Sequence, residues 1–307
     1  MLVDSHAHLF HPKWYPKAFC ESTVRECARR SERVGRVGMS ATTAYLITRM
    51  LSDDSGSVTV KLMDKVGIDR KVILILDLGL ELGEAPLSIE EIHKDVLGIC
   101  RKFSDRLIGF AGVDPRRPQA IGIVRQAFDE LGAKGLKLHP TGGWRLSDEC
   151  THKIVELAEE RGLPVLVHIG RTIDNLKDAN AQPQALIELA RWFPQVQFIA
   201  GHSGFELFED FVNAQQLPGN LRFDISGWQI FANEDEEGCL RNLQKLIQTF
   251  PGRVCYGSDS PFYTYNLVSS EKGWLGLVRR ALAGIPSPVR GLTDGVLGGQ
   301  NVFTPSI

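Results

Sequence analysis

The sequence predicts a (β/α)₈ barrel, in which eight parallel strands alternate with helices. Short apolar runs recur along the chain, segments with helical periodicity separate them, and several runs end in histidine or aspartate. The runs are dense in Val, Ile and Leu rather than strictly alternating with polar residues, which is typical of parallel strands buried on both faces. The eight predicted strands are Leu2–His8, Lys71–Leu76, Leu107–Val113, Gly135–His139, Pro164–His168, Gln197–His202, Leu221–Ile225 and Val254–Asp259.

Helical segments lie between these strands, as βαβ units require. Ser88–Phe103 opens with the spacing of a capping box, Ser88 followed by Glu91. Pro118–Leu131 carries proline in its first turn, where a missing N–H costs least. The other predicted helices are Cys150–Arg161, Pro183–Phe193, Phe205–Gln216, Glu236–Phe250 and Trp274–Ala283. The alternative fold is an open doubly wound sheet, but no G-x-G-x-x-G fingerprint follows the first strand.

The connection between the first two strands is unusually long, spanning about residues 10–69. It contains a basic helix around Ser22–Arg33, and we expect two more helices before Val72. The segment has no clear core of its own, and no linker rich in Pro, Ser or Gly bounds it. We therefore predict one domain, residues 1–307, with a helical insertion over the mouth of the barrel.

Composition restricts the function classes. The 307 residues are 43% hydrophobic and 23% charged, with a net charge of −2, so nothing indicates a nucleic-acid partner. The six cysteines are dispersed, which favours a reducing compartment. The first residues lack the pattern of a signal peptide, and no apolar run is long enough to cross a membrane. We expect a cytoplasmic protein with no membrane partner.

Polar side chains gather at the predicted strand ends. Five of the eight histidines and one aspartate lie at or next to these ends: His6, His8, His139, His168, His202 and Asp259. Active sites of barrels lie at the carboxyl ends of the strands, and residues two apart on a strand point to the same side. Imidazole and carboxylate groups together suit Zn²⁺, Mn²⁺ or Fe²⁺. The set predicts a divalent metal held by His6, His8, His168 and Asp259.

The motifs that contain these residues are H-A-H on the first strand, GLKLHP, PVLVHIG, FIAGHSG and YGSDSPF. In this order they resemble the amidohydrolase superfamily, and in particular its "amidohydrolase 2" branch, which contains metal-dependent hydrolases and related decarboxylases. The resemblance covers nearly the whole chain and is weakest in Leu9–Asp69 and after Phe262. It is specific for the superfamily and unspecific for the substrate.

The resemblance implies a role for each matching residue. His6, His8 and His168 match metal ligands, and Asp259 matches the aspartate that contacts the metal and takes a proton from its water. His202 matches a histidine that binds a second metal or polarises the substrate carbonyl. Lys137 matches a lysine that is carboxylated in two-metal members and bridges the two ions.

The alternative for Lys137 is an ordinary lysine paired with an acid. With one ion we expect such a partner, and Asp4 is one candidate because it shares strand parity with His6. Residues in the loops after the strands are predicted to contact the substrate: His139, Trp144, Arg171 and Trp228.

These residues favour a metal-dependent hydrolase that cleaves a carboxamide, ester or lactone of a small molecule through metal-activated water. Asp259 and His202 are its expected catalytic residues, and its cofactor is one or two divalent ions, with zinc preferred over manganese or iron. The alternative is a metal-dependent non-oxidative decarboxylase of an aromatic or enoic acid, which an arginine clamping the substrate carboxylate would favour. The third hypothesis is a barrel without metal that binds a ligand and is not an enzyme. Relatives are often dimers, so we expect a homo-oligomer.

Overall fold

The computed structural model describes residues 1–33, 49, 51–262, 267–285 and 296. Its centre is one sheet of eight strands in the order β1 to β8, and every neighbouring pair is parallel. The strands are β1 (Val3–Ala7), β2 (Arg70–Leu74), β3 (Leu107–Gly112), β4 (Leu136–Leu138), β5 (Val165–His168), β6 (Phe198–Gly201), β7 (Leu221–Asp224) and β8 (Val254–Cys255).

The last strand returns to the first and makes the barrel nearly closed. The amide of Ser5 donates to the carbonyl of Tyr256 at 2.9 Å, and Ala7 forms an isolated parallel bridge with Ser260. The predicted (β/α)₈ barrel is confirmed.

Two apolar layers explain why the strands are rich in aliphatic residues on both faces. One small cluster joins alternate residues of different strands, among them Val72, Leu74, Phe110 and Leu166. The larger cluster takes the opposite faces, for example Ile73 and its neighbours, and packs them against the helices. Burial on both faces removes the need for polar alternation.

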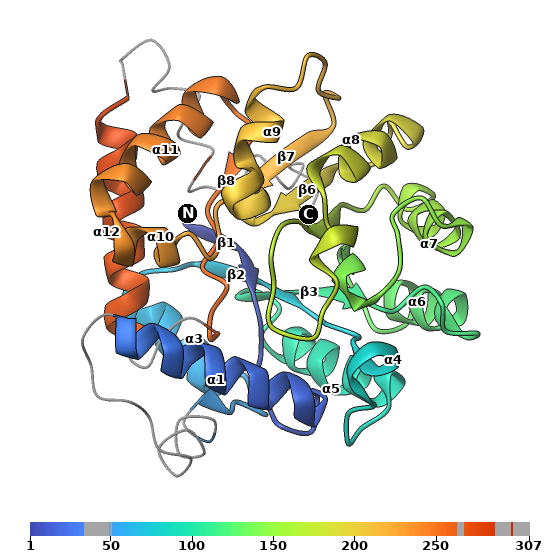
Figure 1. Ribbon diagram of the computed structural model, residues 1–307. Helices are drawn as coiled ribbons and strands as arrows, with labels where there is room; N and C mark the ends of the chain where they lie inside the picture. The colour runs from blue at the N-terminus through green and yellow to red at the C-terminus, as the bar shows by residue number, and fades with distance from the viewer. Residues whose placement is uncertain (34–48, 50, 263–266, 286–295, 297–307) are drawn as a thin grey trace.

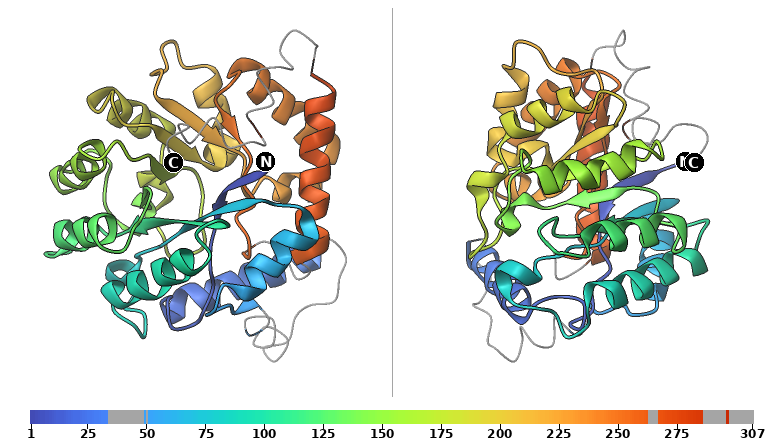
Figure 2. Two further views of the ribbon diagram at one scale, coloured as in Figure 1. Left: turned by 180° about the vertical axis from the view of Figure 1, so that it is seen from behind. Right: turned by 90° about the vertical axis from the view of Figure 1, so that its right-hand side faces the viewer.

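The helices form a ring around the strands (Figure 1), and views from behind and from the side show the same arrangement (Figure 2). They are α1 (Lys17–Arg33), α3 (Ser57–Val66), α4 (Gly79–Leu82), α5 (Ile89–Lys102), α6 (Ala120–Asp129), α7 (Glu149–Glu159), α8 (Pro183–Trp192), α9 (Phe208–Val212), α10 (Gln229–Glu234), α11 (Glu236–Thr249) and α12 (Leu267–Ala283). Three short 3₁₀ helices are Pro140–Gly142, Asp178–Asn180 and His202–Leu207. The predicted capping box at Ser88 and Glu91 is present at the start of α5.

Among the predicted helices that follow strands, two differ most from the observed ones. The helix expected over Phe205–Gln216 is the short α9, because Ser203, Gly204 and Phe205 adopt positive φ angles that interrupt helical geometry. The last helix begins at Leu267 instead of Trp274. Both differences arise beside the strand ends that carry the polar residues.

The insertion supplies α1 and α3, and its residues 34–48 and 50 lie outside the described residues, so the prediction of a further helix there is not tested. The described cysteines are free thiols: Cys20, Cys100, Cys150, Cys239 and Cys255. Among the described helices, none combines the length and apolarity that a membrane crossing requires.

Candidate metal centre

A cavity lies at the carboxyl ends of the strands. The lining residues from the strand ends are His6, His8, Lys137, His139, His168, His202 and Asp259. Its other lining residues are Phe19, Thr23 and Glu26 of α1, with Leu76, Thr172, Ile173 and Phe262. The structure thus brings all of the predicted metal-binding residues to one cavity, as the strand-end rule for barrels requires.

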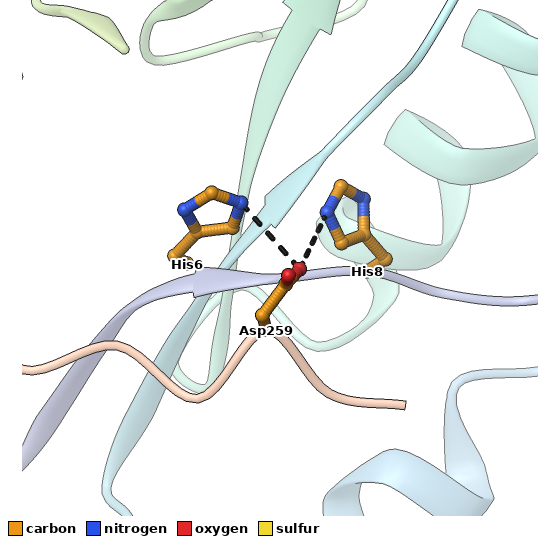
Figure 3. A group of neighbouring side chains, drawn as sticks. All are labelled: His6, His8 and Asp259. Atoms are coloured by element: carbon orange, nitrogen blue, oxygen red, sulfur yellow. Dashed lines mark ion pairs between the residues drawn. The ribbon is translucent and has the colours of Figure 1, made fainter. Parts of the chain in front are cut away.

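His6, His8 and Asp259 form a compact group in this cavity (Figure 3). The Oδ1 atom of Asp259 lies 3.2 Å from Nε2 of His8 and 3.6 Å from Nε2 of His6. One ligand atom from each residue lies within 4.8 Å of the others, and all three side chains are buried. Buried carboxylate and imidazole groups at such separations suit a shared cation.

The outward nitrogen of each imidazole fixes its tautomer. Nδ1 of His6 lies 2.9 Å from Oδ2 of Asp224, and Nδ1 of His8 lies 2.9 Å from the carbonyl oxygen of Leu74. Both partners accept hydrogen bonds, so Nδ1 carries the proton in each neutral ring. The lone pairs of both Nε2 atoms therefore point toward the carboxylate of Asp259. Three electron-pair donors facing one another fit a divalent metal ion.

His168 and His202 form a second contact across the cavity. Nε2 of His202 lies 3.1 Å from Nδ1 of His168, whose other nitrogen lies 3.1 Å from the carbonyl oxygen of Arg171. Nδ1 of His202 lies 3.0 Å from the carbonyl oxygen of Ser226. Both outward nitrogens thus face acceptors, which leaves two lone pairs opposed at the inner contact. In the described part of the chain, His168 belongs to neither of the two compact groups of metal-binding side chains, whereas His202 forms one with His6 and Asp224.

Asp259 occupies an unusual backbone conformation. Its φ angle is 54°, in the left-handed region that L residues other than glycine seldom adopt. Its amide donates to the carbonyl of His6 at 2.7 Å, which ties the segment after β8 to β1. Burial raises the pKa of its carboxyl, but the imidazoles of His6 and His8 outweigh this and hold the pKa below its usual value. The side chain is therefore an ionised carboxylate at neutral pH.

The four residues predicted to contact the substrate do not all lie at the cavity. His139 lines the cavity, stacks on His168 with ring centroids 4.2 Å apart, and has Nδ1 2.7 Å from Oγ1 of Thr141. Arg171 pairs with Glu206 at 3.0 Å. Trp144 and Trp228 are buried, and the Trp228 indole donates to the carbonyl of His202 at 2.7 Å. Of these four, His139 is the one whose side chain lines the cavity.

Several site residues were missed by the sequence analysis. Asp224 and Ser226 support the rings of His6 and His202, and Asp224 lies at the end of β7, where the strand-end rule could have identified it. Phe19, Thr23 and Glu26 occupy one face of α1 at the i, i+4, i+7 spacing of a helix. That face could have been recognised only by knowing that α1 covers the barrel mouth.

Comparison with known proteins places this geometry in a family. The family model described as amidohydrolase matches residues 3–288. The chain belongs to the amidohydrolase family. This confirms the resemblance that the strand-end motifs indicated. A comparison with curated protein sequences gave no match.

Solved structures similar to this chain share its fold at low sequence identity. The 5-carboxyvanillate decarboxylase of Sphingomonas paucimobilis is 16% identical over 98% of both chains, with a TM-score of 0.63. A 5-carboxyvanillate decarboxylase of Novosphingobium aromaticivorans, complexed with manganese and 4-hydroxy-3-methoxy-5-nitrobenzoic acid, is 17% identical over 96% of this chain and 93% of that one, with a TM-score of 0.62. A probable 2-pyrone-4,6-dicarboxylic acid hydrolase of Acinetobacter baumannii is 14% identical over 97% and 99%, with a TM-score of 0.54.

Burial and nearby positive charge keep four imidazoles of the cavity neutral. Burial lowers the pKa values of four rings well below 6.5, and nearby cationic groups, including Lys137, lower them further: His6, His139, His168 and His202. Neutral imidazole is the form that binds a metal. The described cavity is therefore ready to bind a cation without first releasing protons from these rings.

The structure gives Lys137 a different environment from the one predicted for a one-ion site. Asp4 was one candidate for its carboxylate partner, but Asp4 pairs with Lys71 at 3.2 Å, because Lys71 is its register partner on the adjacent strand β2. The Nζ atom of Lys137 is buried and makes no hydrogen bond within the described part of the chain. Burial lowers its pKa to about 8, although Asp224 and Asp259 act in the opposite direction. Lys137 thus lines the cavity with a buried amine that makes no hydrogen bond to a described residue.

Proposed function

We propose that the protein is a metal-dependent hydrolase that cleaves a carboxamide, ester or lactone bond of a small organic molecule. The observation that carries the proposal is the convergence of the His6 and His8 lone pairs on the Asp259 carboxylate inside a cavity. When bound there, a divalent ion supplies Lewis-acid polarisation and an activated water.

The proposed ligands of one ion are His6, His8, His168 and Asp259. For two ions, His202 and a carboxylated Lys137 would join them. Nitrogen and oxygen donors of this kind suit zinc first, with manganese and iron as alternatives. The buried side chains and neutral rings support the assignment.

Asp259 and His202 are the proposed catalytic residues. Asp259 is ionised and buried, so its free oxygen can orient the attacking water, accept its proton and pass that proton to the leaving group. His202 has its Nδ1 proton directed at the Ser226 carbonyl, which leaves Nε2 directed into the cavity. In the proposed mechanism His202 holds the second ion or stabilises the oxygen that develops negative charge.

Hydrolysis is preferred over decarboxylation because the described residues that line the cavity include no arginine. Arg171, which was predicted to contact the substrate, does not line the cavity and is paired with Glu206. One observation favours the second candidate, a non-oxidative decarboxylase of an aromatic or enoic acid. The buried Nζ of Lys137 has no hydrogen-bond partner among described residues, and a substrate carboxylate would provide one.

The experiment is a substrate panel on metal-loaded protein. Aryl esters, lactones and cyclic amides are assayed for acid release, and hydroxybenzoates and enoic acids for carbon dioxide release. Turnover of the first group, lost after chelation and restored by Zn²⁺ or Mn²⁺, supports hydrolysis. Metal-dependent carbon dioxide release alone establishes the decarboxylase. Activity that persists without metal, or binding without turnover, contradicts both.

Cytoplasmic location and a homodimeric state are further proposals. Free thiols at the described cysteines support a reducing compartment. Light scattering on the purified protein tests the dimer.

A further inference from the structure

A buried cluster of charges lies beside the metal centre and joins four parts of the barrel. Lys71 of β2 places Nζ 3.2 Å from Oδ2 of Asp4 on β1 and 2.5 Å from Oε1 of Glu271 on α12. The same Nζ donates to Oγ of Ser260 at 3.1 Å. The side chains of Lys71, Asp4 and Glu271 are between 0% and 2% exposed. None of the three lines the cavity.

The cluster holds both neighbours of Asp259. Asp4 accepts hydrogen bonds from the amide of Ser258 at 2.9 Å and from its hydroxyl at 2.6 Å. Lys71 binds the hydroxyl of Ser260 directly. Asp4 also accepts from the amide of His6 at 3.2 Å. Residues 258 and 260 are thereby fixed to β1 and β2.

Asp259 needs such fixing because of its backbone. A residue other than glycine in the left-handed region carries a conformational cost. The segment would relax to a more common conformation unless the flanking residues were held, and relaxation would turn the carboxylate away from His6 and His8. Strain of this kind persists only where the surroundings overdetermine it.

A purely stabilising role does not account for the cluster. Burying one ammonium and two carboxyls removes them from water, and apolar residues of similar volume often give equal or greater stability. Polar groups can orient the segment around Asp259, because each hydrogen bond fixes the position of one atom, whereas apolar groups cannot do this.

We propose that Lys71, acting through Asp4, Ser258 and Ser260, is a positioning residue that holds Asp259 in its metal-binding orientation. The inference rests on the proposed metal site. Glu271 balances the charge of Lys71 and connects α12 to the same segment, as does the Trp274 indole, which donates to the carbonyl of Gly257 at 2.9 Å.

The test compares Mn²⁺ affinity with folding stability. Lys71→Met keeps the length of the side chain and removes its charge. Titration of the metal-free protein with Mn²⁺, followed by the electron paramagnetic resonance signal of the free ion, gives the dissociation constant. Loss of a residue that orients a ligand typically weakens metal binding about 10- to 100-fold, and we expect a change in that range. Urea unfolding of the same metal-free sample gives the stability.

Arg106→Met is the matched control. Arg106 is partly buried and, like Lys71, is bonded to a carboxylate, here Asp64 at 2.8 Å, but it precedes β3 and so lies at the opposite end of the barrel from the cavity. The control should lower stability and leave Mn²⁺ affinity within about threefold of the wild type, a change too small for the loss of a ligand-orienting group.

Two further variants keep the inference testable if Lys71→Met does not fold. Lys71→Met combined with Glu271→Leu removes both opposed charges, and Ser258→Ala removes one hydrogen bond to Asp4 while leaving the charges in place. Each is expected to weaken Mn²⁺ binding at least several-fold. Wild-type affinity in these variants overturns the positioning role alone. Absence of Mn²⁺ binding by the wild-type protein overturns the metal site, and the inference with it.

Discussion

The support of His6 by Asp224 gives the sharpest prediction about the metal centre. Asp224 accepts from Nδ1 of His6 with one oxygen. Its other oxygen accepts from the amides of Ser226 at 2.8 Å and His202 at 3.2 Å. Asp224→Asn preserves the size of this side chain and replaces one of its two oxygens by an amide nitrogen. The consequence depends on which side receives that nitrogen.

The cheaper orientation keeps the carbonyl oxygen facing the two backbone amides, because the reverse would leave buried donors facing donors at about 1–3 kcal/mol. The new NH₂ group then faces Nδ1 of His6, which must become an acceptor. The proton moves to Nε2, the nitrogen that faces Asp259. Metal binding must reverse this shift, so affinity should fall about 10- to 100-fold, equivalent to roughly 1.4–2.8 kcal/mol.

The assay is competition between the protein and a chromophoric chelator for Zn²⁺ at pH 7.5. Asp114→Asn is the control, since Asp114 is equally buried and follows β3 but binds Arg116, at 2.7 Å, in place of a histidine. It should retain wild-type affinity. An Asp224→Asn variant whose affinity stays within about twofold of the wild type would refute the tautomer argument, because a wrongly protonated ligand cannot bind without cost.

Three other outcomes are expected. Asp259→Asn keeps an oxygen ligand and removes the base, so turnover should fall at least about 100-fold; near-normal turnover with metal bound would exclude the catalytic role. The metal-free protein should lose stability as the pH falls below about 6.5, because the pKa values of four histidines are lower in the folded than in the unfolded chain, which therefore takes up protons first. The free energy of unfolding should fall by up to about 1.4 kcal/mol per pH unit for each ring. A free energy of unfolding in urea that is constant from pH 7 to 5 would contradict this. The carboxylation of Lys137 and the number of bound ions should change together. Where two ions bind, bicarbonate should aid reconstitution of the metal-free protein, and Lys137→Met should lose one ion. An intact-protein mass that shows two ions and no carboxyl group on the lysine would contradict this.

Much of the architecture could be predicted from local patterns. Each predicted strand overlaps an observed one, because a strand that is buried on both faces has a distinctive run of aliphatic residues. The clustering of His6, His8, His168, His202 and Asp259 followed from topology alone, since strand ends of a barrel meet at one mouth.

Other features depended on contacts that local patterns do not encode. The partner of Asp4 is Lys71 and not Lys137, which is decided by strand register. The positive φ angles of Asp259 and Ser203 are held by contacts with other strands: the Asp259 amide donates to the carbonyl of His6, and the Ser203 hydroxyl donates to the carbonyl of Asp224. Trp228 was predicted to contact the substrate from a loop, but its side chain is buried and its indole donates to the carbonyl of His202.

Metal content tests the central claim most directly. Protein purified without chelator is analysed for transition metals beside the His6→Ala and His8→Ala double variant, with circular dichroism to show that both are folded. The account predicts about one or two divalent ions per wild-type chain and loss of the ion held by His6, His8 and Asp259 from the variant. Full metal content in the folded variant, or a wild-type chain that takes up no Zn²⁺, Mn²⁺ or Fe²⁺ when these are supplied, would contradict it.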